Sequence, residues 1–370
     1  MADVVELTKR LISFPSVTPE QAGCLDYIES MLLSAGFKCE RMKFGEVDNL
    51  YARFGNAGKN FCFAGHIDVV PSGNESSWKT PPFEPSVRDG ILYGRGASDM
   101  KAAVAAGLIA GIEFTKKEQG SISFLLTADE EGPGVDGTKK VLETLAKRKE
   151  KIDACIVGEP TNPEKLGEMA KIGRRGSMNC TIKVRGAQGH AAYPHNADNP
   201  VKKLVNILHK LQNYVLDPGN SHFAPSNLEV VTFDVGNPAT NVIPAEARAI
   251  FNIRFNDYYT SEKLKSWIEG VVGDDDKVEL KYHVSGESFL TKPGFLSEIT
   301  VAAVKEVTGL TPELSTTGGT SDARFIHNYA EVIEFGLVNK SAHQVDENAS
   351  VEEIRQLHQV YSKILEKYFA

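Results

Sequence analysis

Residues 60–68 have the sequence Asn-Phe-Cys-Phe-Ala-Gly-His-Ile-Asp. The apolar run over 61–64 is typical of a buried strand, and two ionisable side chains, His66 and Asp68, follow it. In open α/β sheets, functional sites lie at the carboxyl ends of the strands. The stretch therefore predicts a strand that carries an imidazole and a carboxylate to a site at the edge of a sheet.

Further apolar stretches are followed by the same kinds of side chain. The stretch over 122–127 precedes Asp129-Glu130-Glu131, the stretch over 152–157 precedes Glu159, and the stretch over 332–338 is followed by His343. All these residue types bind divalent metals. Their recurrence after buried strands predicts one site at one edge of one sheet.

Size and composition narrow the classes of function. A chain of 370 residues predicts about two domains on a prior of ~150 residues each. The net charge of −8 is spread along the chain, which argues against a nucleic-acid or anionic-membrane partner. The cysteines form no Cys-x-x-Cys pair, and Cys62 and Cys155 lie in apolar stretches, which predicts buried thiols in a reducing compartment. Without a signal-peptide pattern or an apolar run of ~20 residues, we expect a cytoplasmic protein.

The hydrophobic pattern changes beyond Gly176. It predicts strands over 177–185, 227–235, 245–255 and 277–284 and helices over 199–214 and 261–272, in the order β-α-β-β-α-β of a ferredoxin-like unit. We therefore predict an α/β fold with a mixed-sheet catalytic domain formed by residues 1–176 and 292–370. Residues 177–291 are predicted to form an inserted ferredoxin-like domain.

Asp99 follows Gly94-Arg95-Gly96 and precedes a predicted helix over 100–114 that is apolar nearly all round. An aspartate at this position is often an N-cap with no further role. The flanking glycines and the neighbouring strand ends favour the alternative, a carboxylate that lies at the same edge as His66.

The candidate metal ligands are His66, Asp99, Glu131, Glu159 and His343. Imidazole nitrogen and carboxylate oxygen suit Zn²⁺, Mn²⁺ or Co²⁺, and the lack of thiolates argues against a structural zinc-finger site. Five ligands exceed the needs of one tetrahedral ion and fit two ions that share a carboxylate and hold a water between them. We expect Asp99 to be the shared ligand, with His66 and Glu159 on one Zn²⁺ and Glu131 and His343 on the other.

Two more carboxylates are predicted at this edge. Two adjacent acidic residues in a loop are commonly exposed to solvent. Here the preceding strand is expected to direct Glu130 toward the site. Glu130 is therefore predicted to take a proton from water and to deliver it to a leaving amine. The carboxylate of Asp68 is predicted to orient the His66 ring.

Several motifs resemble those of the co-catalytic zinc aminoacylase and carboxypeptidase-G superfamily of metallopeptidases. They are Gly-His-Ile-Asp-Val-Val-Pro at 65–71, Gly-Arg-Gly-Ala-Ser-Asp-Met-Lys at 94–101, Asp-Glu-Glu-Gly at 129–132 and Gly-Glu-Pro-Thr at 158–161. The resemblance covers essentially the whole chain. It implies a zinc-peptidase catalytic domain that hydrolyses an amide, with the ligands, base and supporting aspartate on the residues chosen above. It also implies a cis peptide bond after Asp99.

A second group of motifs resembles one branch of this superfamily, whose substrate carries several carboxylates. They are Gly-Arg-Arg-Gly-Ser at 173–177, Gly-His-Ala-Ala-Tyr-Pro-His at 189–195, Asn-Val-Ile-Pro at 241–244 and Gly-Gly-Thr-Ser-Asp-Ala-Arg-Phe at 318–325, where Ala323 replaces an expected glycine. For such a substrate, the residues expected to bind carboxylates are Arg175, Arg254 and Arg324, together with the Gly-rich turn that carries Thr320 and Ser321. Arg174 either joins them or faces solvent.

The same resemblance implies a homodimer formed through the inserted domain. His190 would reach the site of the partner subunit and stabilise the oxyanion, with help from Asn241. His195, in the same motif, is expected to be structural.

Two alternatives stay open. Another amide hydrolase of the superfamily, such as an acetylornithine deacetylase or an aminoacylase, would share the fold and the metals. A non-catalytic metal-binding or peptide-binding member should have lost a ligand or the base, and all of these are present here.

Overall fold

The computed structural model describes residues 3–56, 58–117 and 120–370, and it divides into two compact units. The first unit contains the residues up to Ile172 together with Thr291–Ser315 and Ser321–Ala370. The inserted unit contains Gly173–Leu290 and Thr316–Thr320. The insertion therefore begins at Gly173 and ends at Leu290, where the sequence predicts 177 and 291, and the Gly-rich segment at 316–320 belongs to it.

The first unit is built around a mixed sheet with the strand order β1-β2-β6-β3-β7-β18-β8-β17. The strands are β1 (Lys38–Phe44), β2 (Val47–Phe54), β6 (Ser121–Thr127), β3 (Asn60–His66), β7 (Ala154–Val157), β18 (Glu331–Glu334), β8 (Met169–Lys171) and β17 (Glu313–Ser315). In its centre, β6, β3, β7 and β18 are neighbours and run parallel. Their carboxyl ends therefore meet at one edge of the sheet.

The last of these strands is shorter than predicted. β18 ends at Glu334, whereas the apolar run continues to residue 338. Beyond it, the backbone of Gly336 packs against the carbonyl oxygens of Gly158 and Glu159, an approach that a side chain at Gly336 would prevent. The contact places this segment beside the end of β7.

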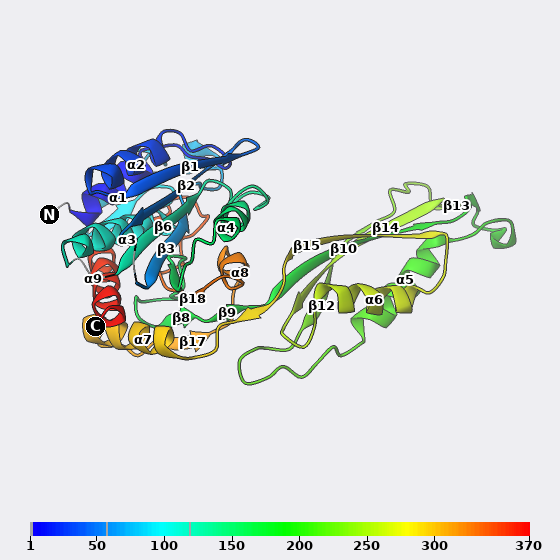
Figure 1. The fold of residues 1–370 in the computed structure, drawn as a ribbon. Coiled ribbons are helices and arrows are strands. Elements are labelled where there is room, and N and C mark those ends of the chain that lie inside the picture. The colour runs from blue at the N-terminus through cyan, green and yellow to red at the C-terminus, as the bar shows by residue number, and fades with distance from the viewer. Residues whose placement is uncertain (1–2, 57, 118–119) are drawn as a thin grey trace. The chain divides into compact units, whose positions relative to one another are not determined.

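Helices cover both sides of this sheet. Figure 1 shows α3 (Lys101–Phe114) and α9 (Val351–Tyr368) on one side and α4 (Thr138–Lys147) and α8 (Ala323–Ile326) on the other. α1 (Val4–Ile12) packs against α3 and α9, α7 (Phe295–Thr308) packs against α9, and α2 (Cys24–Ser34) packs against β1 and β2. Single-turn helices lie at Glu75–Ser77 and Thr115–Lys117. None of the described helices has the length and apolar character that crossing a bilayer requires.

α3 approaches the strand ends closely because glycines face it. A Cβ at Gly158 would lie 2.7 Å from the Cβ of Ala103, and a Cβ at Gly65 would overlap the side chain of Met100. The helix is buried nearly all round, as its sequence predicts. This packing brings Asp99, which precedes α3, to the carboxyl ends of β3 and β7.

A small antiparallel sheet joins two distant segments of the first unit. It has the order β19-β5-β4 and is formed by β4 (Ser86–Arg88), β5 (Ile91–Tyr93) and β19 (Asn348–Ser350). Asn348 pairs with Tyr93. The segment that precedes β19 therefore lies beside the loop that follows β5 and leads to Asp99.

The inserted unit has the β-α-β-β-α-β order that the sequence predicts. It contains β10 (Gly176–Arg185), α5 (Pro200–Gln212), β12 (Asn227–Asp234), β14 (Glu246–Phe255), α6 (Ser261–Val272) and β15 (Val278–Gly286), and its antiparallel sheet has the order β12-β14-β10-β15. Alternate residues of β14, such as Phe251 and Ile253, form the core with α5 and α6. Short pairs are formed by β9 (Gly173–Arg174) with β16 (Phe289–Leu290) and by β11 (Gly189–His190) with β13 (Val242–Ile243), and a single-turn helix lies at Pro194–Asn196.

Candidate metal centre

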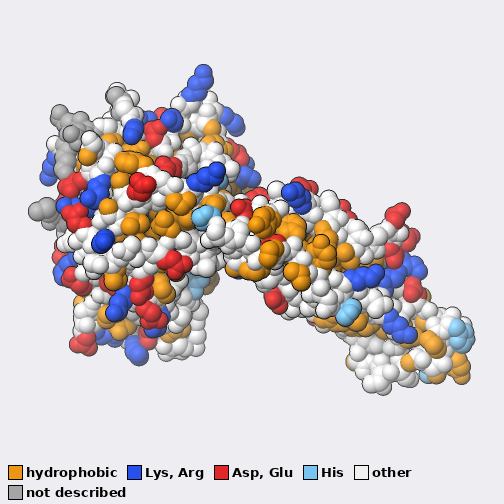
Figure 2. All heavy atoms as spheres, turned by 90° about the horizontal axis from the view of Figure 1, so that it is seen from below, with side chains coloured by type: hydrophobic (Ala, Val, Ile, Leu, Met, Phe, Trp, Pro, Cys, Tyr) orange, Lys and Arg blue, Asp and Glu red, His pale blue; other side chains and the backbone are white. Residues whose placement is uncertain are grey.

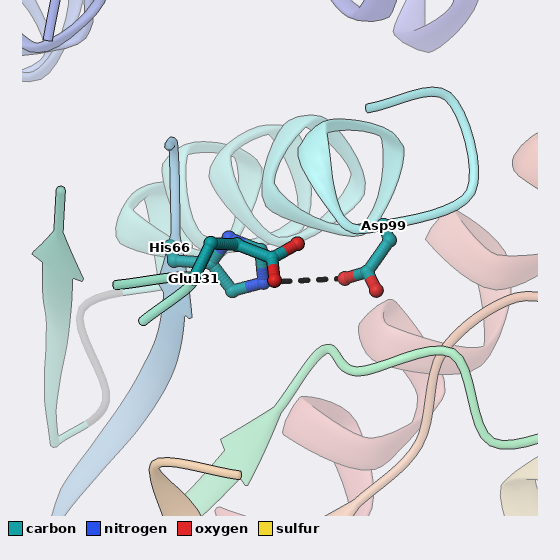
Figure 3. A group of neighbouring side chains, drawn as sticks. All are labelled: His66, Asp99 and Glu131. Atoms are coloured by element: carbon teal, nitrogen blue, oxygen red, sulfur yellow. Dashed lines mark hydrogen bonds and ion pairs between the residues drawn. The ribbon is translucent and has the colours of Figure 1, made fainter. Parts of the chain in front are cut away.

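Asp99 lies between two imidazole rings. Its Oδ1 is 3.2 Å from Nε2 of His66, and its Oδ2 is 3.3 Å from Nε2 of His343. Figure 3 shows His66, at the end of β3, and Asp99, just before α3, converging with Glu131. A carboxylate that turns one oxygen toward each ring has the geometry needed to bridge two cations.

Each imidazole also has a glutamate beside it. Oε1 of Glu159 is 3.7 Å from Nε2 of His66, and Oε1 of Glu131 is 2.9 Å from Nε2 of His343. The ligand atoms of His66, Asp99 and Glu131 lie within 4.8 Å of one another, and so do those of His66, Glu130 and Glu159. The structure thus brings together all the predicted ligands, from positions that lie far apart in the sequence.

The backbone of Asp68 orients the His66 ring. Nδ1 of His66 is 2.9 Å from the backbone carbonyl oxygen of Asp68, whereas the Asp68 carboxylate is 3.7 Å away. The sequence predicts this role for the carboxylate, so the structure differs from the expectation in the atom that is used. With Nδ1–H donated to the carbonyl, the neutral ring has a free lone pair on Nε2, which faces Asp99 and Glu159.

The Asp68 carboxylate instead holds the backbone of the acidic loop. It accepts hydrogen bonds from the N–H of Glu130 at 3.4 Å and from the N–H of Glu131 at 3.1 Å. Burial raises the pKa of Asp68 to about 6, although the charge of His66 opposes the shift. Asp68 therefore connects the position of His66 to the positions of the next two carboxylates.

Burial and mutual repulsion act on the carboxylates of this cluster. Burial raises the pKa of Glu130 to about 8 against the effect of His66, and the charges of Asp322 and Glu131 contribute. Burial, followed by the charges of Asp99 and Glu130, raises the pKa of Glu159 well above its usual range. Hydrogen bonds to Asp99 and Glu131 raise the pKa of His343 to about 10. The site therefore has an excess of negative charge that positive charge would stabilise.

The residues fit a pair of divalent cations. Oε1 of Glu159 is buried and has no hydrogen-bond partner among the described residues, so this oxygen is available to a cation. Two imidazole nitrogens with carboxylate oxygens form the donor set of zinc, manganese or cobalt sites. His66, Asp99 and Glu159 would hold one ion, and His343, Asp99 and Glu131 the other.

Two other predicted site residues also belong to the first unit. Ser321 is fully buried, and its hydroxyl donates to Oε1 of Glu334 at 2.8 Å. The guanidinium of Arg324 packs over the ring of Phe325 and opposes the burial that raises the pKa of Asp322. Asp322, which the sequence analysis does not single out, thus adds to the negative charge around Glu130.

The remaining predicted residues lie in the inserted unit. His190 is exposed and pairs with Val242, and the N–H of Ala191 donates to the carbonyl of Asn241 at 2.9 Å. Nδ1 of His190 accepts a hydrogen bond from the N–H of Ala192 at 3.1 Å. A neutral His190 ring must therefore carry its proton on Nε2, where it can be donated.

The arginines of the inserted unit differ in their surroundings. Arg175 donates to Oδ1 of Asn227 at 3.0 Å, and burial and the charge of Arg254 lower its pKa. Arg174 is buried and donates to the carbonyl of Thr317 at 3.2 Å, so it does not face solvent. Thr320 is partly exposed at the end of the Gly-rich turn, and His195 is exposed with its ring edge-on to Tyr193.

Glu347 is a second residue near the centre that was not predicted from the sequence. Glu347 is fully buried and accepts hydrogen bonds from the N–H groups of Gly96, Ser98 and Asp99. In the sequence it stands in a polar stretch that is typical of an exposed loop. The sequence feature that could have indicated a role for Glu347 is its position four residues after the candidate ligand His343. A polar stretch by itself does not show that one of its carboxylates is buried.

Comparison with known proteins identifies the family. The model of peptidase family M20/M25/M40 matches residues 62–367. The chain belongs to this family. It is 55% identical to the succinyl-diaminopimelate desuccinylase of Parvibaculum lavamentivorans, over 100% of this chain and 96% of that protein. It is 53% identical to the succinyl-diaminopimelate desuccinylase of Rhodospirillum centenum, over 100% of this chain and 98% of that protein.

Solved structures of M20 proteins share the fold. The metallo-carboxypeptidase Sso-CP2 from Sulfolobus solfataricus superposes with a TM-score of 0.81 at 17% identity, covering 100% of this chain and 99% of that one. The YXEP protein of Bacillus subtilis, described as a dinuclear metal binding peptidase, superposes with a TM-score of 0.73 at 14% identity. The superposition covers 99% of this chain and 98% of that one. Both comparisons support the mixed-sheet α/β architecture with its insertion.

Proposed function

We propose that this M20 chain is a succinyl-diaminopimelate desuccinylase, a hydrolase of linear amides. It would convert N-succinyl-LL-2,6-diaminopimelate and water to succinate and LL-2,6-diaminopimelate, in diaminopimelate and lysine biosynthesis. The observation that carries the substrate assignment is the similarity to proteins of that name, at 49–55% identity over 99–100% of this chain. The motifs at 173–177, 189–195, 241–244 and 318–325 resemble the same enzyme.

The cofactor in this proposal is a pair of Zn²⁺ ions, for which Co²⁺ or Mn²⁺ can substitute. The support is the position of Asp99 between His66 and His343, together with the buried, unpaired oxygen of Glu159. Bound cations of this kind polarise an amide carbonyl and make water nucleophilic at neutral pH.

Glu130 is proposed to move the proton. Its carboxylate would accept a proton from the attacking water, hold it on one oxygen, and give it to the amide nitrogen as the C–N bond breaks. The immediate products are then a carboxylic acid and a neutral amine, and the proton of the acid passes to the amine or to solvent as the carboxylate forms. In the metal-free protein, burial and neighbouring carboxylates raise the pKa of Glu130 to about 8. The positive charge of bound cations would lower this pKa, so that the carboxylate could accept a proton near neutral pH. Asp68 positions this base through the N–H of Glu130.

His190 is proposed to stabilise the oxyanion. The hydrogen bond from Ala192 to Nδ1 leaves the proton of the neutral ring on Nε2, which can donate to a developing negative oxygen. We propose a homodimer in which His190 of the partner subunit acts at this site, with help from Asn241, which lies in the turn just before β13. An exposed edge strand supports dimerisation, because β12 ends the inserted sheet and carries exposed Val231 and Phe233. Figure 2 shows hydrophobic side chains gathered on the inserted unit.

The substrate has several carboxylates, and the candidates to bind them are basic. Arg175 and Arg254 lie close enough for the charge of Arg254 to lower the pKa of Arg175, and such a pair favours a bound carboxylate. Arg324 and the turn containing Thr320 and Ser321 are proposed for the carboxylates of the diaminopimelate part. We also propose a cytoplasmic location, which the free cysteines support.

The test is a comparison of substrates with the metal-loaded and metal-free enzyme. We expect release of succinate from N-succinyl-LL-diaminopimelate to be about 10–150-fold more efficient than release of acetate from N-acetylornithine, because a succinyl carboxylate paired with arginine contributes roughly 1.5–3 kcal/mol. Activity should be lost after dialysis against a chelator and should return with two equivalents of Zn²⁺ per chain. Preference for N-acetylornithine would favour the alternative deacylase, and activity that resists the chelator would refute the metal centre.

A further inference from the structure

The side chain of Glu347 gathers four hydrogen-bond donors from one loop. Its Oε1 accepts from the N–H of Ser98 at 2.9 Å and of Asp99 at 3.0 Å. Its Oε2 accepts from the N–H of Gly96 at 2.9 Å and from Nη1 of Arg95 at 2.8 Å. This buried carboxylate therefore fixes the backbone immediately before the side chain that lies between the two histidines.

These donors require an acceptor at both oxygens. A glutamine in the same place would have an NH₂ group on one side, and that group would face two N–H donors whichever way the amide turned. Two of the four hydrogen bonds would then be lost, and buried donors would be left without partners, which is unfavourable. A side chain that only filled space in the core would not need two acceptor oxygens, each facing two donors.

Glu347 also belongs to the segment that carries the second histidine. Its N-terminal neighbour Asp346 and the ligand candidate His343 both have left-handed backbone conformations, with φ of 59° and 61°. Such conformations are unfavourable for residues other than glycine and persist where surrounding contacts impose them. Nη1 of Arg95 donates to the carbonyl of Gln344 at 3.3 Å, and the carbonyl of Glu347 accepts from the N–H of Gly94 at 2.9 Å.

The contacts between the two segments form one connected network. Pairing of β19 with β5 aligns them, the Arg95–Glu347 ion pair lies buried between them, and the hydroxyl of Ser98 donates to the carbonyl of Val338 at 2.6 Å. Asp99 lies at one end of this network and His343 at the other. Their side chains face each other at 3.3 Å.

We propose that Glu347 is a positioning residue for the dinuclear metal centre. It holds the bridging Asp99 and the ligand His343 at the spacing that two cations require. The inference rests on the proposed metal centre, and it adds a residue that would bind no metal and contact no substrate. Groups that orient metal ligands typically change metal affinity by about 10–100-fold when they are mutated.

The test measures metal binding directly, with Co²⁺ as the probe. Full-length metal-free Glu347→Gln is titrated with Co²⁺ by calorimetry, and the visible absorption of bound Co²⁺ reports the ligand geometry. Glu353→Gln is the matched control, because Oε1 of Glu353 accepts the N–H of Leu166 at 2.9 Å without contacting the cluster. We expect Co²⁺ affinity to fall about 10–100-fold in Glu347→Gln, with a changed spectrum, and both to remain as in wild type in Glu353→Gln.

Different outcomes separate this inference from the proposed function. If Glu347→Gln melts at a lower temperature but binds Co²⁺ with wild-type affinity and spectrum, Glu347 is merely structural and the inference is refuted. If Glu347→Gln does not fold, Glu347→Asp decides, because its side chain is one methylene shorter and cannot reach both pairs of donors. This variant should bind Co²⁺ more weakly than wild type. Wild-type affinity in Glu347→Asp would also refute the inference. Wild-type protein that binds fewer than two Co²⁺ would refute the metal centre itself.

Discussion

The backbone carbonyl of Asp68 lies 2.9 Å from Nδ1 of His66, while the carboxylate of the same residue accepts the N–H of Glu131 at 3.1 Å. One residue thus supports two parts of the candidate site through different atoms. Its carbonyl fixes the ring that faces Asp99, and its carboxylate fixes the loop that carries Glu130. Variants of Asp68 can therefore separate the two effects.

Asp68→Asn should retain metal and lose activity. The carbonyl that orients His66 remains, but the new NH₂ group would face an N–H of the 130–131 backbone. We expect kcat to fall roughly 10–100-fold, which corresponds to about 1–3 kcal/mol for a buried donor that loses its partner. Metal analysis and steady-state kinetics on the same preparation would check this. Loss of metal with the activity would show that the carboxylate itself holds His66.

Glu130→Gln should keep both metals and lose proton transfer. The amide cannot accept a proton from water, so kcat should fall by about 10²–10⁴-fold with little change in KM. Glu46→Gln, in the exposed turn between β1 and β2, is the control for the mutation type. A Glu130→Gln enzyme with the turnover of the control would disprove the assignment of the base.

His190→Asn should lower kcat without altering metal content. Loss of one oxyanion donor typically costs about 10²–10³-fold in kcat. His195→Asn is the matched control, because His195 is exposed in the same motif. Mixing inactive His190→Asn with inactive Glu130→Gln should restore part of the activity if each subunit lends its histidine to the other, and unrestored activity would contradict the shared site.

Arg254→Gln should weaken substrate binding. Removing a charge-assisted hydrogen bond to the succinyl carboxylate should raise KM about 10–100-fold. Arg248→Gln, on the same strand with an exposed side chain, should leave KM unchanged. Equal KM values for the two variants would remove Arg254 from the binding site.

The metal-free protein should become less stable as pH rises. The pKa of Glu130 is raised from 4.5 to about 8, so the folded state binds this proton more tightly than the unfolded chain does. Its contribution to stability is present below the unfolded pKa and is lost as pH rises toward 8. The pKa of His343, raised from 6.5 to about 10, acts in the same direction over a higher range.

Urea unfolding of the metal-free protein between pH 5 and pH 9 would measure this slope. Glu130→Gln should flatten it below pH 8, whereas Glu46→Gln should leave it unchanged. Added Zn²⁺ should reverse the trend, because its ligands bind in their deprotonated forms and its affinity therefore rises with pH. A free energy of unfolding that rises from pH 5 to 8 in the metal-free protein would contradict the prediction.

Much of the fold could be predicted from local patterns in the amino-acid sequence. The apolar runs before His66, Glu130 and Glu159 are buried parallel strands, and the β-α-β-β-α-β order of the insertion is present. The predicted strand over 332–338 was too long, because an apolar pattern does not reveal the close backbone approach at Gly336. The cis peptide bond between Asp99 and Met100, implied by the resemblance, is present.

The sequence by itself determined which residue types stand after which strands, and hence the candidate ligands His66, Asp99, Glu131, Glu159 and His343. That information is local, because side-chain periodicity and the residue that follows a strand are fixed along the chain. Only the tertiary structure decided which atom of Asp68 holds His66 and that Glu347 holds the loop of Asp99. The contacts of Glu347 depend on the pairing of β19 with β5, which joins residues about 250 positions apart. The Asp68 carboxylate is engaged by the N–H groups of Glu130 and Glu131, which lie more than 60 positions further along the chain.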